Sequence, residues 1–197
     1  MSCQQKIDKA ITVGIIPYKD FDNKKIKELN KTIKDYYQVT TKILPNQELP
    51  RQAFIDIKSP RYRADSIIAV QRRKNKDLDY IIGFTHKDIS ITKRDNNGNI
   101  RKPVYRYNDF GIMGLAYCPG NSCVVSDFRL KHENNEIQFG RFKKVTIHEL
   151  GHNFGLPHCK DKKCVMTDAV ESIKTIDNAN PDLCTKCKKK LNIQKSI

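Results

Sequence analysis

Two histidines one helical turn apart give this chain its clearest chemical signal. The stretch HELGHNFGLPH places His148 and His152 four residues apart, so that on a helix both imidazoles project from one face. Two imidazoles arranged in this way can bind one Zn²⁺ from the same side. Glu149 stands beside the first histidine and could reach a water on the metal without binding the metal itself. The spacing therefore predicts a zinc site with a carboxylate positioned for proton transfer.

A glycine and a third histidine extend this pattern. Gly155 is expected to end the helix, because glycine adopts backbone angles that a Cβ opposes. The resulting turn would bring His158 back as a third ligand and leave a fourth position open, as a catalytic zinc requires. A histidine pair alone also occurs in helices where both rings pack or face solvent. The additional glycine, histidine and Met166 argue against that interpretation.

Four cysteines near the C-terminus form a second pattern. Four residues separate Cys159 from Cys164, and two residues separate Cys184 from Cys187. Two close pairs joined by a longer loop are typical of a closed tetrathiolate zinc site. Its binding energy would help to fold a segment that has few apolar residues. The alternative is two disulfide bonds in an exported domain.

Taken together, these residues resemble a known family. H-E-x-x-H-x-x-G-x-x-H with a following methionine resembles the metzincin clan of zinc peptidases. The longer run HELGHNFGLPHCKDKKCVM, followed by Cys184 and Cys187, is similar to the archaemetzincins. The stretch GIMGLAYCPGNSCVVSDFRL resembles that family's edge strand and its last strand before the active-site helix. The first 110 residues resemble the family only in the order of strands and helices.

The resemblance implies a zinc-dependent metallopeptidase, a hydrolase that cleaves peptide bonds with a zinc-activated water. His148, His152 and His158 would bind the catalytic zinc, and Glu149 would act as general base and acid. Met166 would form the turn beneath the metal. The ligands of a second, structural zinc would be Cys159, Cys164, Cys184 and Cys187. The implied cofactor content is thus two Zn²⁺ per chain, and the implied partner is a peptide or protein substrate.

The implied fold is an α/β (α+β), metzincin-like zincin fold, with a twisted mixed sheet backed by helices. One metallopeptidase domain would cover residues 1–197. Its N-terminal lobe, residues 1–155, would end with the active-site helix. Its C-terminal lobe, residues 156–197, would contain the methionine turn and the cysteine zinc site. An edge strand formed by Gly114, Leu115, Ala116 and Tyr117 is expected to hold the substrate as an additional strand.

Hydrophobic periodicity predicts the elements that would position these residues. Strands are expected at 11–18, 39–44, 79–85, 112–117 and 123–126, and helices at 22–37, 61–74 and 137–154. Their order predicts βαβ units and a largely parallel sheet. Asp22 is a candidate N-cap. A loop is expected around Pro45 and Pro50, and a loop or hairpin at 93–103 around Asn97-Gly98.

Length, composition and charge limit the possible classes. The chain has 197 residues, 38% of them hydrophobic, which suits one domain or two small lobes and argues against disorder. No apolar run approaches the roughly 20 residues that span a bilayer, so a membrane-spanning protein is excluded. The 37 Lys and Arg against 22 Asp and Glu give a formal charge of +15. Such a charge favours solubility, acidic peptide substrates or an anionic surface.

The start of the chain and the remaining cysteines bear on its compartment. MSCQQKIDKAITVG contains no apolar signal segment, so a cytoplasmic location is expected. The alternative is a lipoprotein whose leader was removed before Cys3. Cys118 and Cys123 flank a Pro-Gly turn and are expected to be small buried thiols, which could pair if oxidised.

Two other functions compete with the peptidase. In a basic binding module, the histidines would be structural and the cysteine site would present lysines to nucleic acid, namely Lys186, Lys188, Lys189 and Lys190. The positive charges are instead spread along the chain, without the interleaved aromatic residues that stack bases, so nucleic acid is not an expected partner. In a catalytically idle metzincin-like scaffold, the intact Glu149 would have no purpose.

Overall fold

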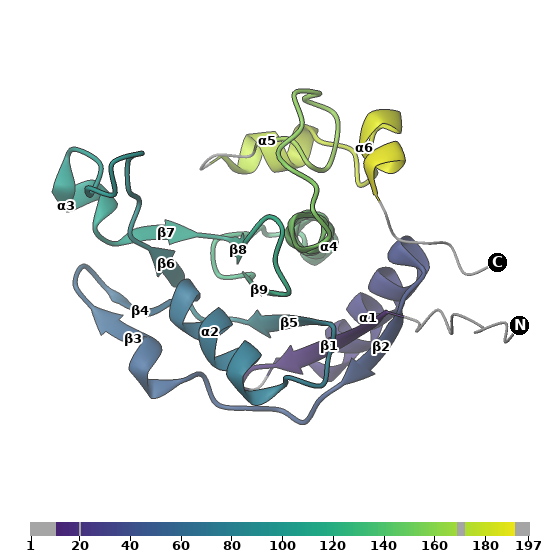
Figure 1. Ribbon diagram of the computed structural model, residues 1–197, viewed down its shortest axis with the longest axis horizontal. Helices are drawn as coiled ribbons and strands as arrows, with labels where there is room; N and C mark the ends of the chain where they lie inside the picture. Colours follow the sequence, from purple (N-terminus) through teal and green to yellow (C-terminus); the bar gives the residue numbers. More distant parts are fainter. Residues whose placement is uncertain (1–10, 20, 169–171, 192–197) are drawn as a thin grey trace, which may run out of the picture.

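The computed structural model describes residues 11–19, 21–168 and 172–191 (Figure 1). The strands are β1 (Thr12–Pro17), β2 (Thr40–Ile43), β3 (Phe54–Asp56), β4 (Pro60–Arg63), β5 (Tyr80–Thr85), β6 (Ile89–Ile91), β7 (Phe110–Ile112), β8 (Gly114–Ala116) and β9 (Ser122–Ser126). The helices are α1 (Asn23–Tyr37), the 3₁₀ helix η1 (Arg51–Ala53), α2 (Ala64–Lys74), α3 (Val104–Tyr107), α4 (Asn135–Asn153), α5 (Ile173–Asn178) and α6 (Thr185–Lys190). Among the helices of these ranges, none combines the length and apolar character of a membrane span.

The main sheet has five strands in the order β2-β1-β5-β9-β8. The pairings of β1 with β2, β1 with β5, and β5 with β9 are parallel, whereas β8 pairs antiparallel with β9 at the edge. This confirms the mixed, largely parallel sheet and the position of residues 114–116 at its edge. Helices α1 and α4 cover one face and α2 covers the other (Figure 1).

Burial on both faces explains the apolar central strands. In β1, Val13 and Ile15 pack toward α1 and α4, while Ile16 packs toward Ile67 of α2. All residues of β9 are likewise buried. A parallel strand covered by helices on both sides reads as a continuous apolar run, which is why these strands are visible in the sequence.

A second sheet, in the order β3-β4-β6-β7, corrects several predicted elements. The elements η1, β3, β4 and β6 were not expected, and the helix predicted from residue 61 begins only at Ala64, since residues 60–63 form β4. The predicted strand 112–117 is two strands, β7 and β8, which belong to different sheets. Three- or four-residue strands with charged members such as Arg61 and Arg63 show no readable alternation.

The helix termini follow ordinary capping chemistry. The Asp22 side chain accepts a hydrogen bond from the Lys24 backbone N–H, which confirms it as the N-cap of α1. Helix α4 begins before the predicted residue 137, because the Asn134 side chain caps it by accepting from two backbone N–H groups. It ends at Asn153 rather than 154, and Gly155 follows at φ +88°. Gly98, at φ +81°, turns the expected hairpin.

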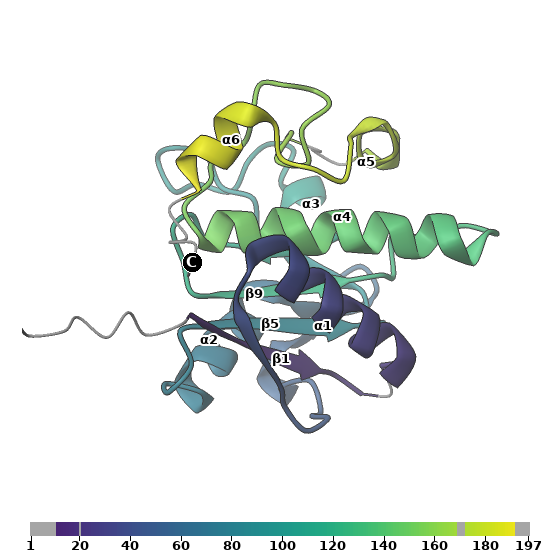
Figure 2. The same ribbon diagram turned by 90° about the vertical axis from the view of Figure 1, so that its right-hand side faces the viewer.

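The C-terminal segment with α5 and α6 lies on the side of α4 that faces away from the main sheet (Figure 2). A bidentate ion pair holds this segment against α4. The Nε and Nη2 of Arg141 donate to the two carboxylate oxygens of Asp177 in α5, each at 2.7 Å. The neighbouring Lys144 ammonium donates to the Ile176 carbonyl at 2.9 Å. Together these contacts fix α5 over the middle of α4.

The ion pair predicts a pH-dependent stability. The Arg141 guanidinium lowers the pKa of Asp177 below the usual value of about 3.9. The contribution of the ion pair to the free energy of unfolding is therefore complete above about pH 4, the unfolded-state pKa of an aspartate. It is lost as the pH falls through the lowered pKa of Asp177 in the folded state. We expect Asp177→Asn to melt at a lower temperature than wild type at about pH 7, with the gap closing at low pH. Melting curves across this range test the prediction, with exposed Asp77→Asn as control; a constant gap would contradict it.

Candidate metal centre and cleft

Two backbone carbonyls orient the histidines of α4. The Nδ1 of His148 hydrogen-bonds the Val165 carbonyl at 2.8 Å, and the Nδ1 of His152 hydrogen-bonds the Leu156 carbonyl at 2.7 Å. A carbonyl oxygen only accepts, so both Nδ1 atoms carry a hydrogen. Burial lowers the pKa of His148 to about 4 and that of His152 in the same direction. Both rings are therefore neutral near pH 7, with the lone pair on Nε2.

The third histidine returns to these two through the turn at Gly155. The ring centroid of His158 lies 4.8 Å from that of His152 and 5.4 Å from that of His148. The three residues each offer a ligand atom, and these atoms lie within 4.8 Å of one another. The structure thus brings together the three histidines that the sequence singled out.

The spacing of the ring nitrogens fits a zinc ion. The Nε2 atoms of His148 and His152 are 3.0 Å apart. Zn–N bonds of about 2.0–2.1 Å in a tetrahedral site would place two nitrogens about 3.3 Å apart. Two bare lone pairs this close repel each other unless a cation lies between them. The histidine cluster therefore has the donor chemistry and the spacing that Zn²⁺ needs.

Glu149 lies beside this cluster, with only 8% of its surface exposed. Its burial raises the pKa of its carboxyl to about 8. The backbone of β8 passes directly over the side chain: a Cβ at Gly114 would lie 2.6 Å from Oε1 of Glu149 and 2.7 Å from its Cγ. Gly114 therefore leaves the space that the carboxylate occupies, a requirement that the sequence did not reveal.

The four cysteines form a second cluster. Their sulfurs lie within 4.8 Å of one another, and those of Cys159 and Cys184 are 3.7 Å apart. Zn–S bonds of about 2.3 Å in a tetrahedral site would separate two sulfurs by about 3.8 Å. A hydrogen bond from the Cys187 backbone lowers the pKa of Cys184 to about 7, which favours the thiolate. The thiols are free, so the geometry fits a shared metal rather than two disulfide bonds.

The two clusters are joined by a short segment of backbone. Cys159 follows His158 directly, and its N–H donates to the Met166 carbonyl at 2.7 Å. Val165, whose carbonyl orients His148, follows Cys164. Met166 is buried against α4, where a Cβ at Gly151 would lie 2.5 Å from its sulfur. The Met166 side chain thus packs against the helix that carries His148 and His152.

A cleft of about 290 Å³ opens beside the histidines. One wall is β7 with Met113 and Gly114, and another is the C-terminal segment that includes His158, Val165 and Ile176. Four residues of α4 complete the lining: Lys144, Val145, His148 and Glu149. Of the predicted substrate strand, Gly114 lines the cleft, Leu115 and Ala116 complete β8, and Tyr117 follows the strand with 54% of its surface exposed. Phe110 and Gly111 of β7 also line the cleft, and sequence reasoning missed them.

The cysteines outside this cluster differ in their exposure to solvent. Cys123 in β9 is buried, as expected, whereas Cys118 is exposed in the Pro-Gly turn, so the expectation of a buried thiol is wrong there. Both are free thiols. Cys3 lies outside the described residues.

The chain is a zinc metallopeptidase, as its similarity to known proteins shows. Comparison with known proteins gives the family: the chain belongs to peptidase family M54, whose family model matches residues 7–193. The archaemetzincin of Haloquadratum walsbyi is 30% identical over 188 residues, covering 91% of this chain and 98% of its own length. That of Methanopyrus kandleri is 31% identical over 140 residues, covering 71% and 70%.

Solved structures share the fold. The crystal structure of the Methanopyrus kandleri archaemetzincin aligns with a TM-score of 0.73 at 24% identity, covering 92% of this chain and 93% of the other. That from Archaeoglobus fulgidus aligns with a TM-score of 0.72 at 23% identity, covering 91% and 99%. The predicted family and fold class are thus confirmed. Family membership also favours the enzyme over the nucleic-acid-binding module.

Gly114 provides a test of the site geometry. Gly114→Ala should displace the Glu149 carboxylate and reduce kcat/KM by about 100-fold or more, with metal content unchanged. The matched control is Gly140→Ala on α4, where a Cβ meets no atom within 4 Å. The control should retain activity and gain about 0.4–1 kcal/mol of stability. Peptide hydrolysis and elemental analysis measure both effects, and full activity of Gly114→Ala would refute the contact.

Proposed function

We propose that the chain hydrolyses peptide bonds at the histidine cluster, with Glu149 as general base and acid. The observation that carries this proposal is the convergence of three histidine side chains beside one buried carboxyl group at a cleft. Family membership supports the reaction class. The local geometry supports these roles, because the Nδ1 atoms of His148 and His152 are hydrogen-bonded to backbone carbonyls and the backbone of β8 lies close against the Glu149 side chain.

His148, His152 and His158 would hold Zn²⁺, which when bound lowers the pKa of a water toward about 7 and polarises the scissile carbonyl. The Glu149 carboxylate takes the proton from the attacking water and delivers it to the departing amine. Gly114 holds the carboxylate in place during both transfers.

The edge strand β8 supplies a binding surface for the substrate. It pairs with β9 on one side only, so its other edge can accept an extended peptide as an additional strand. Since Gly114 belongs to β8 and touches Glu149, a peptide added there would have its backbone next to the base. The adjacent cleft, walled by apolar residues such as Ile112 and Val145, would take a substrate side chain.

The cysteine cluster would bind a second, structural Zn²⁺ through Cys159, Cys164, Cys184 and Cys187. We assign the lobes as residues 1–155, ending just after α4, and 156–197, organised by this site.

The charge of +15 and the lysines of the cleft, Lys93 and Lys144, favour acidic peptides among the substrates. The free thiols suit a reducing compartment such as the cytoplasm.

The role of Glu149 is tested by Glu149→Gln. We expect zinc content at the wild-type level and peptide hydrolysis reduced by about 10²–10⁴-fold, because the amide cannot accept the proton. Glu136→Gln, in the exposed first turn of the same helix, is the matched control and should remain fully active. Survival of activity in Glu149→Gln would refute the assignment of the base. Loss of zinc in that variant would show that Glu149 helps to hold the metal, which would contradict the proposed set of three histidine ligands.

The number and location of the metals are tested by elemental analysis. Wild type should contain two zinc ions per chain, and His152→Ala should retain one, because the cysteine cluster shares no ligand with the histidines. His132→Ala, a histidine outside both clusters, should retain two. A single zinc that is unaffected by His152→Ala would remove the catalytic centre from the proposal.

A further inference from the structure

The wall of the cleft opposite α4 is built from two different sheets. β7 pairs with β6 in the four-stranded sheet, and β8 pairs with β9 in the main sheet, with Met113 between them. In the described residues, no strand ladder connects the two sheets. The width of the cleft therefore depends on whatever fixes β7 relative to β9 and α4.

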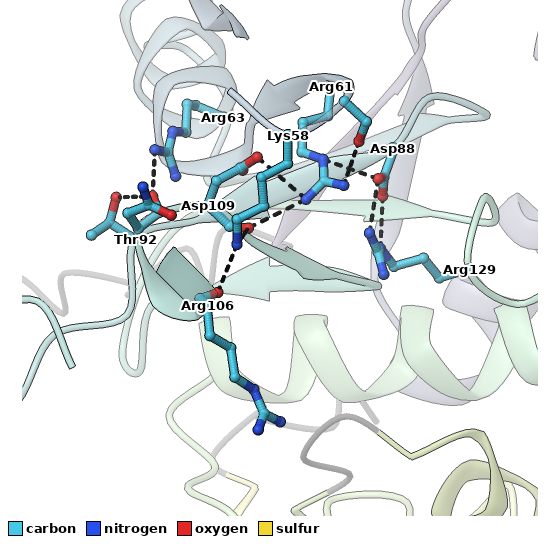
Figure 3. A network of polar contacts seen from close by, with 10 residues as sticks. Lys58, Arg61, Arg63, Asp88, Thr92, Arg106, Asp109 and Arg129 are labelled. Carbon is cyan, nitrogen blue, oxygen red and sulfur yellow. Dashed lines mark hydrogen bonds and ion pairs between the residues drawn. The ribbon is translucent and has the colours of Figure 1, made fainter. Parts of the chain in front are cut away.

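A row of alternating charges bridges the two sheets at this point, beside the apolar core that they share (Figure 3). Arg129, between β9 and α4, donates from Nε and Nη2 to the carboxylate oxygens of Asp88 at 2.7 and 2.8 Å. Asp88 lies between β5 and β6 and is only 5% exposed. A bidentate arginine–carboxylate pair has a fixed planar geometry, so it sets orientation as well as distance.

The row continues to the start of β7. Nε of Arg61, in β4, lies 3.2 Å from Oδ2 of Asp88, and its Nη1 lies 3.4 Å from Oδ2 of Asp109. The same Nη1 donates to the Asp109 carbonyl at 3.3 Å. Asp109 directly precedes β7 and is 1% exposed, so Arg61 supplies the countercharge that its buried carboxylate requires.

Arg129 also touches β7 itself. A Cβ built on Gly111 would lie 2.0 Å from Nη2 of Arg129 and 2.1 Å from its Cζ. The guanidinium thus lies directly against the backbone of β7, next to the residues that line the cleft. A side chain from the β9–α4 connection therefore meets the second sheet at two points, the Asp88 carboxylate and the Gly111 backbone.

We propose that Arg129 is a positioning residue for peptide hydrolysis, which sets the width of the cleft by holding β7 at a fixed distance from α4. The inference rests on the proposed function, because it assumes that substrate occupies this cleft. In the described residues, no hydrogen bond or ion pair joins Arg129 to the histidines or to Glu149, so its effect would pass through β7. It is also the suitable residue to change, because its side chain is 33% exposed. Removing buried Arg61, Asp88 or Asp109 would strand an unpaired charge and endanger folding.

The first test compares Arg129→Ala with Arg73→Ala, an exposed arginine in the last turn of α2. For a peptide long enough to span the cleft, Arg129→Ala should raise KM by about fivefold or more, with kcat within about twofold of wild type. Zinc content should be unchanged. Amide hydrogen exchange of residues 110–112 should become faster. Arg73→Ala should match wild type in all four measurements.

The second test uses the contact with Gly111. Gly111→Ala alone should raise KM, because its methyl group meets the guanidinium. In the Arg129→Ala background the methyl group has room, so the same substitution should change KM by a factor close to one. An equal factor in both backgrounds would show that the two residues are not coupled and would overturn the proposal.

The outcomes separate this proposal from the one on which it rests. If wild type fails to hydrolyse peptides, the proposed function fails, and unchanged exchange of residues 110–112 in Arg129→Ala would independently reject the positioning of β7. If wild type is active but Arg129→Ala retains wild-type KM and exchange, the peptidase assignment stands and the positioning role is overturned.

Discussion

Two hydrogen bonds from histidine to backbone determine most of the site. The bond from His148 to the Val165 carbonyl and the bond from His152 to the Leu156 carbonyl fix the tautomer and the orientation of both rings. The same bonds tie the segment after α4 back onto that helix. The chemistry of the centre and the docking of the C-terminal segment are therefore one constraint. Without that segment, the imidazoles would keep their helical spacing but lose their direction.

The helix that carries these rings is in turn placed by the main sheet. Phe142 and Leu150 of α4 are almost completely buried in the same core as Val125 of β9 and Ile82 of β5. Apolar packing at close to crystalline density gives such a helix little freedom to slide. The antiparallel edge strand β8 then passes over Glu149 at a distance that only glycine permits. The apolar core thus positions both the helix that carries Glu149 and the edge strand that lies against it.

The sequence predicted the parts of this protein that depend on local spacing. The histidine and cysteine sets, the cap at Asp22 and the turn at Gly98 each follow from residues close in the chain. The structure brings the side chains of each set together and confirms the cap and the turn. The central strands were visible because burial on both faces leaves an unbroken apolar run. The second sheet was not, since its strands are short and it is held by long-range ion pairs such as Arg61 with Asp88. No local pattern in the sequence indicates that pair.

The three consecutive residues from Cys164 to Met166 each make a different contact. Cys164 turns its sulfur to the cysteine cluster, Val165 offers its backbone oxygen to His148, and Met166 packs its side chain against Gly151. The middle residue serves His148 through its backbone oxygen, so that hydrogen bond does not depend on which side chain stands there. The spacing is not free, because a single inserted or deleted residue would misalign all three partners. In evolutionary terms, this stretch should tolerate substitution at its centre far better than any change in length.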